Sequence, residues 1–507
     1  MSVERNRAAP ATGTTRDARA RSCWRRFALA LAILAPVLAG CSSALISAGG
    51  PPAALPQAAR QAKAPPQSPA QREHQRILAA YNGQYDDARL ESLLNALVAK
   101  LIAASERPDL QYRVTILNSA SVNAFALPNG NLYVTRGLIA LANDSSELAS
   151  VLAHEMSHVI ARHAEMREDE LQKVALVTRV FTDLGGDPET SALALAKSKI
   201  KLASFSRAQE LEADAIGIRI AAHAGYDAYG AVRFLTSMGR NAELKAMPAA
   251  SRMDPGAPDF LSSHPATPER IRNAQISARQ FAPAVEPERD KKAYLAGIDG
   301  MIYGEDPSEG FVRGRRFLHP KLGFTFLAPE GFTLDNTAQA VLGLREGGGQ
   351  AMRVDVVNVP AEQTLVAYLT SGWIENIDPK TVEETTINGL SAATATAKGD
   401  QWVFRLYAVR FGSEVYRFIF AAKRMNAEVD HIFREAVATF RRMTIAESEG
   451  AKPLRLSIAT VGQGDTVDSL AARMGPPDRQ LERFRILNGL SAHDGINVGD
   501  QVKLVLE

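Results

Sequence analysis

The segment AHEMSHVIARH, from Ala153 to His163, contains three histidines and a glutamate in a chain of 507 residues with only 9 histidines. His154 and His158 are four positions apart, so on a helix both imidazoles point to the same side. Two imidazoles one helical turn apart can each offer a nitrogen to one zinc ion. Glu155, between them, can take a proton from the attacking water. The spacing predicts a metal centre that activates water for hydrolysis.

A second pair of residues supplies the ligand that this motif lacks. In FSRAQELEADAIG, Glu210 and Asp214 are again four positions apart on a predicted helix. Catalytic zinc takes three protein ligands and one water, so Glu210 completes a set of two histidines and one glutamate. Asp214, one turn further, is placed to accept the free ring N–H of a ligating histidine and to fix its tautomer.

Two more residues are candidates beside this centre. His264, in SSHPATPER, lies in a loop fixed by Pro265 immediately before a predicted helix. If the loop returns to the cleft, His264 either donates to the oxyanion or occupies the water position and closes the site. A histidine in a surface turn is the alternative. Arg207 is a second candidate stabiliser, although an arginine this close to a carboxylate in sequence often forms only a helix pair.

The helix that holds the two histidines has a clear predicted start. Asp144 can cap it, and Glu147, three positions later, forms a variant of the capping box. Leu148, Leu152 and Val159 fall on one stripe that is suited to burial. The histidines then point together from a neighbouring face.

A hairpin is predicted upstream of this helix. YRVTIL and NLYVT have the composition of strands, and the Asn129-Gly130 pair between them is a strong signal for a tight turn. Residues 125–135 are therefore predicted to form a β-hairpin. Its exposed edge could pair with an extended peptide, which makes Asn123, Ala124 and Phe125 candidate substrate contacts.

The two motifs together resemble the HtpX-type family of zinc metallopeptidases, in particular its periplasmic BepA-like members. The similarity extends from EHQRILAAYNGQYDD through VNAFALPNGNLYVTRGL, HExxH and SRAQELEAD to LSSHPATPERI. The resemblance implies one zinc ion per chain. It implies metal ligation by His154, His158 and Glu210, catalysis by Glu155 and support from Asp214.

The first forty residues predict the compartment. An arginine pair precedes an apolar run from Phe27 to Leu38, which is too short to span a bilayer easily and is typical of a signal-peptide core. The run ends in LAGC, which resembles the bacterial lipobox, in which Cys41 is lipidated; an uncleaved anchor helix is the alternative. Ser42 after the cysteine implies, by this resemblance, the outer membrane of a Gram-negative bacterium. Pro- and Ala-rich residues 42–71 are predicted to form a flexible tether.

Charge and cysteine content exclude some functions. The formal net charge is +2, but residues 1–40 hold seven arginines and two acids, a net of +5, so the remainder is 2 − 5 = −3. No long Lys/Arg stripe indicates nucleic acid as a partner. Of the 2 cysteines, Cys23 lies in the predicted leader and Cys41 at its cleavage point, so no internal disulfide is expected in the mature chain.

The predicted fold class is α+β, with a mostly helical, zincin-like metallopeptidase domain over residues 72–283 that contains a small β-hairpin or sheet. Residues 284–318 are predicted to be a linker. Residues 319–447 alternate strand-like segments and end in an amphipathic helix, and this α+β domain resembles PsbP-like domains. Residues 454–507 resemble a LysM repeat with the order βααβ. The resemblance implies binding of N-acetylglucosamine-containing glycans of peptidoglycan, and a purely structural role is the alternative.

These features predict a lipid-anchored zinc endopeptidase of the periplasm that cleaves extended or unfolded polypeptides. Misfolded or misassembled envelope proteins are the substrates that the family resemblance implies. One alternative is a non-proteolytic assembly factor or scaffold that is anchored to peptidoglycan. Another is a metallo-amidase that acts on peptidoglycan itself, which only the LysM-like segment suggests.

Overall fold

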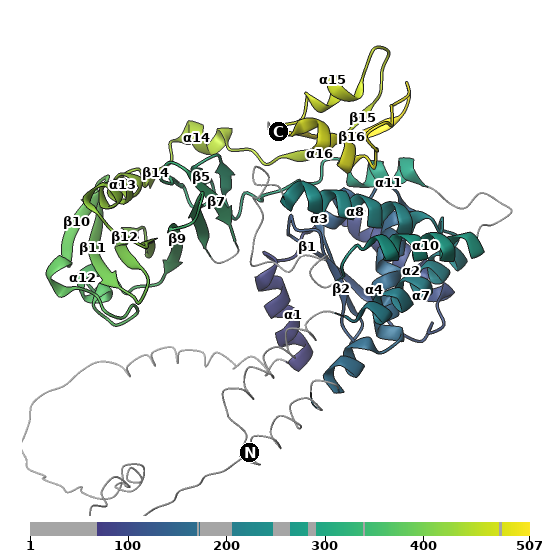
Figure 1. The fold of residues 1–507 in the computed structure, drawn as a ribbon, viewed down its shortest axis with the longest axis horizontal. Helices are drawn as coiled ribbons and strands as arrows, with labels where there is room; N and C mark the ends of the chain where they lie inside the picture. Colours follow the sequence, from purple (N-terminus) through teal and green to yellow (C-terminus); the bar gives the residue numbers. More distant parts are fainter. Residues whose placement is uncertain are drawn as a thin grey trace, which may run out of the picture. The chain divides into compact units, whose positions relative to one another are not determined.

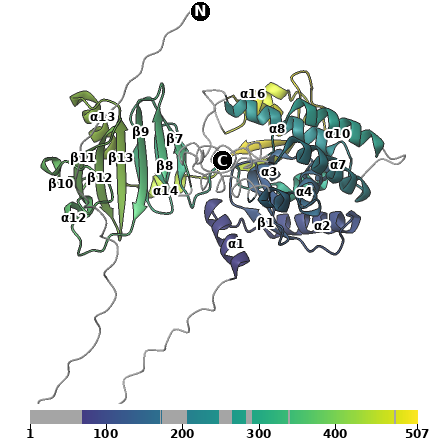
Figure 2. The ribbon, with the colours of Figure 1, turned by 60° about the horizontal axis from the view of Figure 1, so that its bottom comes forward.

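The computed structural model of the chain describes residues 68–169, 172, 205–246, 264–281, 290–337, 340–475 and 479–507. The predicted lipidation site Cys41, the leader before it and the tether as far as residue 67 lie outside these ranges. Figures 1 and 2 show the described helices and strands as coloured ribbons. Among the described residues, no helix combines the length and the apolar character that a membrane span requires.

Helix α4 (Ser145–Ile160) begins where the sequence predicts. The Asp144 side chain accepts a hydrogen bond from the Glu147 backbone N–H at 2.8 Å, and Glu147 Oε2 accepts one from the Asn143 backbone N–H at 2.9 Å. Every residue of the helix from Ser146 to His158 is buried. The sequence predicted burial of one apolar stripe only, whereas nearly the whole surface of α4 is buried, because other elements cover its remaining faces.

Three helices and a small sheet provide this cover, and Figure 1 shows them gathered around α4. Helices α2, α7 and α8 contact α4, and α10 contacts both α7 and α8. The helices of this region are α1 (Pro69–Ala80), α2 (Ala88–Ala104), α3 (Arg136–Leu141), α7 (Arg207–His223), α8 (Gly230–Ala246), α10 (Pro268–Gln280) and α11 (Lys291–Ile298).

The predicted hairpin is confirmed as part of this small sheet. Strand β2 (Ala124–Ala126) pairs antiparallel with β3 (Asn131–Thr135), and β1 (Arg113–Leu117) pairs parallel with β3, in the order β1-β3-β2. The turn requires Gly130, which has a φ of 84° and whose added Cβ would lie 2.1 Å from the Gln111 carbonyl oxygen. The edge strand β2 contacts α4, so the hairpin lies beside the helix with the histidines.

The described strands between Phe311 and Arg442 form two antiparallel sheets. The larger has the order β10-β11-β12-β13-β9-β8-β7, which Figure 2 shows nearly face on. Helices α12 (Leu365–Leu369) and α13 (Ala427–Ala438) cover its opposite faces with separate apolar clusters. The smaller sheet has the order β14-β6-β5-β4. The bounds are β4 (Phe311–Arg313), β5 (Arg316–His319), β6 (Phe324–Leu327), β7 (Phe332–Asn336), β8 (Val341–Arg345), β9 (Gln350–Val357), η1 (Pro379–Thr381), β10 (Glu383–Ile387), β11 (Leu390–Lys398), β12 (Val403–Phe411), β13 (Glu414–Ala422) and β14 (Arg441–Arg442).

The C-terminal segment follows the predicted βααβ order after α14 (Ile445–Gly450). It consists of β15 (Arg455–Thr460), α15 (Val467–Ala471), α16 (Gln480–Leu487) and β16 (Gln501–Leu506), with β15 antiparallel to β16. We call these four elements the C-terminal module.

Residues 300–303 extend the sheet of the C-terminal module. The Tyr303 N–H donates to the Leu454 carbonyl at 2.8 Å, and the Leu456 N–H donates to the Met301 carbonyl at 2.9 Å. The segment predicted to be a linker, residues 284–318, thus includes α11, this extra pairing and β4. The chain runs away from the module after Tyr303 and returns beside it at Leu454. The larger and the smaller sheet, which lie between these two residues in the sequence, are therefore an insertion.

The C-terminal module shares its apolar core with the helices around α4. Leu138 and Phe234 belong to the same cluster of buried side chains as Phe484, Leu487 and Leu504. The described residues from 68 to 507 belong to one compact unit. The predicted α+β class, with a mostly helical first domain and separate β-sheets, is confirmed.

Candidate metal centre

Four buried side chains from three parts of the chain meet at one point. His154, His158, Glu210 and His264 each offer one ligand atom, and these atoms lie within 4.8 Å of one another. His154 Nε2 lies 3.1 Å from His158 Nε2 and 3.3 Å from His264 Nδ1. Glu210 Oε1 lies 2.8 Å from His264 Nδ1 and 3.6 Å from His158 Nε2. Nitrogen and carboxylate donors in such a cluster match the ligands that zinc takes in proteins.

Close packing of two helices brings these ligands together. Helix α4 holds His154 and His158, whereas α7, which begins after the Ser206 capping box, holds Glu210. Gly217 of α7 touches α4 so closely that an added Cβ would lie 2.9 Å from the backbone nitrogen of His154. Glycine at this position therefore sets the distance between the two helices that carry ligands.

Asp214 and Arg270 surround the ligand set. Asp214 Oδ1 lies 3.0 Å from His154 Nδ1, the ring nitrogen that faces away from the cluster, as predicted. Arg270 of α10 binds Asp214 with two hydrogen bonds, of 2.8 and 2.7 Å, and its Nη1 lies 2.8 Å from Glu210 Oε2. Sequence reasoning missed Arg270. Its place in SSHPATPERI, at the third position of a helix that starts with a proline, was the available signal.

A second histidine orients His158. The Nδ1 atoms of His158 and His163 are 3.0 Å apart, and His163 Nε2 lies 3.3 Å from a carboxylate oxygen of Glu212. Helix α4 ends at Ile160, and Arg162, with a φ of 57°, turns the chain so that His163 reaches back. The sequence predicts only a structural role or a helix-end charge for His163, because its spacing from His154 does not match the helical period.

Comparison with known proteins identifies the segment of the chain that contains these residues. Residues 88–278 match the family model described as Peptidase family M48. These residues form a peptidase family M48 domain.

Curated relatives match this same region. The beta-barrel assembly-enhancing proteases of Yersinia pestis and Escherichia coli (strain K12) are 31% and 29% identical over 233 and 221 residues. These matches cover 43% and 42% of this chain and 45% and 43% of the relatives. The mitochondrial metalloendopeptidase OMA1 of Schizosaccharomyces pombe is 28% identical over 201 residues, which are 38% of this chain and 56% of the relative. The chain thus spans about half the length of the curated relatives that it matches.

Among solved structures, cyanobacterial PsbP (CyanoP) from Synechocystis sp. PCC 6803 is similar at 14% identity. The match covers 26% of this chain and 98% of that chain, with a TM-score of 0.21. A TM-score this low does not establish a shared fold.

His264 lies inside the M48 domain and belongs to the ligand cluster. It is 2% exposed, which contradicts the alternative of a histidine in a surface turn. The Thr267 side chain caps α10, and Pro268 is its first residue, as predicted. The contacts of His264 with His154 and Glu210 show that the loop before α10 reaches the ligand cluster. His264 Nε2 lies 3.8 Å from Glu155 Oε1.

Burial controls the protonation of the residues in the M48 site. It lowers the pKa of His158, and it lowers the pKa of His264 to about 3. Neutral imidazoles keep a free nitrogen lone pair, which a metal ligand needs. Burial, together with the negative charge of Glu210, raises the pKa of Glu155 well above its ordinary value. Burial would also raise the pKa of Asp214, but hydrogen bonds with Arg270 and His154 outweigh it and hold that pKa well below the usual range.

The predicted substrate contacts on the hairpin have different exposures. Asn123 is buried and donates to Tyr81 Oη at 2.7 Å, and Ala124 is buried as well. Phe125 is partly buried and stacks on Tyr133, with ring centroids 4.9 Å apart. The backbone of Ala126, at the end of β2, hydrogen-bonds the Glu155 carboxylate. The backbone of β2, more than these three side chains, therefore lies next to the catalytic candidate.

Arg207 lies apart from the ligand cluster. It forms an ion pair with Glu269, and its side chain is 74% exposed. The arginine that contacts Glu210 is Arg270 instead, because α10 folds back over the start of α7.

Proposed function

We propose that this chain is a zinc endopeptidase of the bacterial envelope, which cleaves unfolded or misassembled polypeptides. The observation that supports it most is the buried set of His154, His158 and Glu210 with Glu155 beside it. The M48 domain and the relatives named as proteases support the same reaction class. The alternatives of a scaffold and of a peptidoglycan amidase become outcomes of the tests below.

The roles of the residues follow from their positions. When bound to His154, His158 and Glu210, zinc supplies Lewis-acid activation of water and of the scissile carbonyl. Glu155 takes the proton of the attacking water and passes it to the leaving amine. Its raised pKa suits this task, because a carboxylate that holds a proton well can act as base and then as acid. Asp214 keeps His154 in the tautomer whose Nε2 faces the cluster.

The extended substrate pairs with the free edge of β2 in this proposal. Strand β2 is at the edge of its sheet and contacts α4. A polypeptide added there hydrogen-bonds to backbone groups whatever its sequence, which suits an enzyme for unfolded chains. Substitution of Phe125 by aspartate should then raise KM for an unfolded protein, and an unchanged KM would contradict this docking mode.

The central test compares the wild type with Glu155→Gln. The glutamine variant should retain one zinc ion per chain and lose cleavage of unfolded casein by about 10²–10⁴-fold, because the general base is removed and the ligands are kept. Zinc content by atomic absorption and casein cleavage by gel provide the readouts. Glu243→Gln, at an exposed position of α8, is the matched control and should cleave like the wild type. Full activity of Glu155→Gln would eliminate the mechanism.

We also propose that His264 closes the site by occupying the position where water must bind. Its Nδ1 lies within 3.3 Å of His154 Nε2 and 2.8 Å of Glu210 Oε1, among the ligand atoms themselves. His264→Ala should therefore raise casein cleavage several-fold, and His493→Ala, at an exposed position of the C-terminal module, should not. A decrease in His264→Ala would favour the oxyanion role instead, and no change would remove both roles.

The cellular placement remains part of the proposal. Lipidation of Cys41 and a flexible tether would hold the M48 domain at the outer membrane, on its periplasmic side. Incorporation of labelled palmitate into the wild type, and its absence from Cys41→Ala, would test the anchor.

The other two regions complete the proposal. The C-terminal module has the βααβ order of a LysM repeat, and glycan binding by it would hold the enzyme at peptidoglycan. Co-sedimentation with purified peptidoglycan tests this role; protein that stays in the supernatant would favour a structural one. We expect the inserted PsbP-like sheet domain to bind or pack rather than to catalyse.

A further inference from the structure

One side chain of the C-terminal module, that of Lys503, is buried against the M48 domain. Lys503 of β16 is 0% exposed. Its Nζ donates to the carbonyl oxygens of Ala140, Leu141 and Ala142 at 2.8, 3.3 and 2.7 Å. Ala140 and Leu141 are the last residues of α3 and Ala142 is its C-cap, and carbonyls at the end of a helix have no partner within their own helix. An ammonium group has three donors, so one lysine can satisfy all three carbonyls.

The carbonyls belong to residues 140–144, which connect α3 to α4 and which we call the α3–α4 joint. Asp144, the last residue of the joint, caps α4, and Glu147 in its first turn bonds back to Asn143. Arg233 of α8 contacts Asp144 at 2.9 Å and Glu147 at 3.4 Å. Burial lowers the pKa of Lys503 to about 7, and the carboxylates of Glu147 and Asp144 oppose this shift. Arg233 from α8 and the Nζ of Lys503 from β16 therefore both bind the same short segment.

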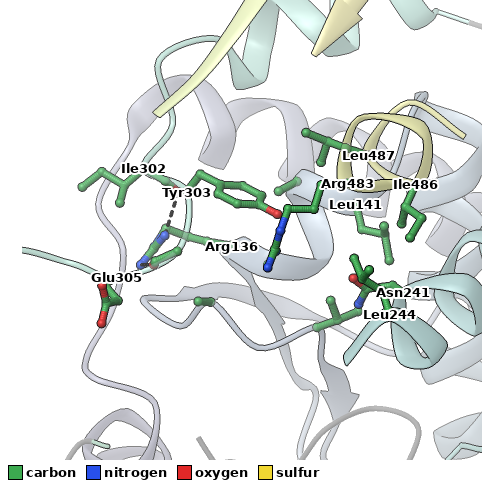
Figure 3. Close-up of a pocket in the computed structure, with 15 residues that line it drawn as sticks. Arg136, Leu141, Asn241, Leu244, Ile302, Tyr303, Glu305, Arg483, Ile486 and Leu487 are labelled. Atoms are coloured by element: carbon green, nitrogen blue, oxygen red, sulfur yellow. Dashed lines mark hydrogen bonds between the residues drawn. The ribbon is translucent and has the colours of Figure 1, made fainter. Parts of the chain in front are cut away.

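The module also makes apolar contacts beside the hydrogen bonds of Lys503. Figure 3 shows Leu141 of α3 and Leu244 of α8 lining one pocket with Ile486 and Leu487 of α16. Gly489, just after α16, lies so close to the joint that an added Cβ would be 3.1 Å from Asn143 Nδ2. The module thus packs against the joint on more than one side of Lys503.

The start of α4 determines where its ligands lie. His154 follows Asp144 by ten positions, or about 15 Å along a helix. A helix transmits a shift at its start to residues further along, because its backbone hydrogen bonds keep it rigid. Because Gly217 of α7 already touches the backbone of His154, α4 cannot shift at this crossing without changing its packing against α7. A displaced joint therefore changes the distance between His154 and Glu210.

We propose that Lys503 is a positioning residue of the metal centre, which fixes the start of α4 through the α3–α4 joint. The inference rests on the proposed zinc chemistry of the M48 domain. In this proposal the metal centre requires the C-terminal module for its geometry. This role is separate from the binding of any ligand by the module.

The test uses the full chain with Lys503→Met, which keeps the length of the side chain but removes its three donors. Arg455→Met is the matched control. Arg455 belongs to the same module and also donates to a backbone carbonyl, that of Gly300 at 2.7 Å, away from the joint. Zinc affinity is measured by competition with a chelator, ligand geometry by the visible spectrum of the cobalt(II) protein, and kcat and KM with unfolded casein.

Lys503→Met should bind zinc about tenfold more weakly or worse, change the cobalt spectrum and lower kcat with KM little altered. Arg455→Met should keep the zinc affinity and the spectrum of the wild type. Two results would overturn the proposal: wild-type zinc affinity and spectrum in folded Lys503→Met, or an equal change in both variants. If Lys503→Met does not fold, Lys503→Gln, which retains two donors, is measured by the same criteria. A wild-type chain that binds zinc but cleaves nothing would refute the proposed function, and the zinc affinities would still decide the role of Lys503.

Discussion

At the metal centre, the carboxylates of Glu210 and Asp214 lie near each other in the core because one guanidinium contacts both. Arg270 neutralises part of their charge, and this makes it possible to bury them beside neutral imidazoles. Removal of one partner from such a network leaves a buried charge without compensation, which is costly. Each residue at this centre thus depends on the others for its protonation state.

The contact between Asp214 and His154 leads to a prediction at this scale. Asp214→Asn should bind zinc about 10- to 100-fold more weakly, because the amide no longer provides the charged acceptor that holds the imidazole in place. Competition with a chelator measures the effect. Asp169→Asn changes an exposed aspartate and serves as the control. Equal affinities in the two variants would show that Asp214 does not orient His154.

At the scale of elements, the distance between α4 and α7 decides whether the ligands meet. Gly217→Ala should destabilise the fold by about 1–3 kcal/mol and weaken zinc binding, because the new methyl group meets backbone atoms that cannot move separately. Gly239→Ala in α8 is the matched control, since an added Cβ there has no atom within 4 Å. It should stabilise the chain by about 0.5–1 kcal/mol, because alanine favours a helix. Urea unfolding of both variants measures the difference, and a neutral Gly217→Ala would refute this account of the packing.

At the scale of the whole molecule, the inserted sheet domain can be followed separately. Of the 3 tryptophans, Trp24 lies in the predicted leader, whereas Trp373 and Trp402 lie in the insertion. Tryptophan fluorescence of a chain without the leader therefore reports the unfolding of this domain.

His319 makes the stability of this domain sensitive to acid. Burial lowers the pKa of His319 to about 4, whereas an unfolded histidine has a pKa of about 6.5. The unfolded chain binds the proton first, so stability is fully present above pH 6.5 and decreases by about 2–3 kcal/mol as the pH falls towards 4.

His319→Asn should remove this part of the pH dependence in urea unfolding followed by fluorescence. His431→Asn should not, because the His431 side chain is 69% exposed. Curves for His319→Asn that lose stability between pH 6.5 and 4 as steeply as the wild type would contradict the assignment.

Local periodicity in the sequence was enough to predict the helix start at Asp144, the hairpin turn at Gly130 and the candidate ligands His154, His158 and Glu210. Side chains four residues apart on a helix point the same way, so their spacing in the sequence is enough to predict that they share one face of the helix. The order βααβ of the C-terminal module followed instead from the resemblance of residues 454–507 to a LysM repeat.

Tertiary structure alone decided which distant side chains complete the site. Arg270 reaches Asp214 because α10 packs on α7, and His163 reaches His158 because Arg162 takes a left-handed conformation. No local pattern in the sequence around Lys503 predicts that its side chain is buried against Ala142, which lies 361 residues earlier in the chain. Such contacts depend on how whole elements pack in the core, and the spacing of residues along the chain does not specify that packing.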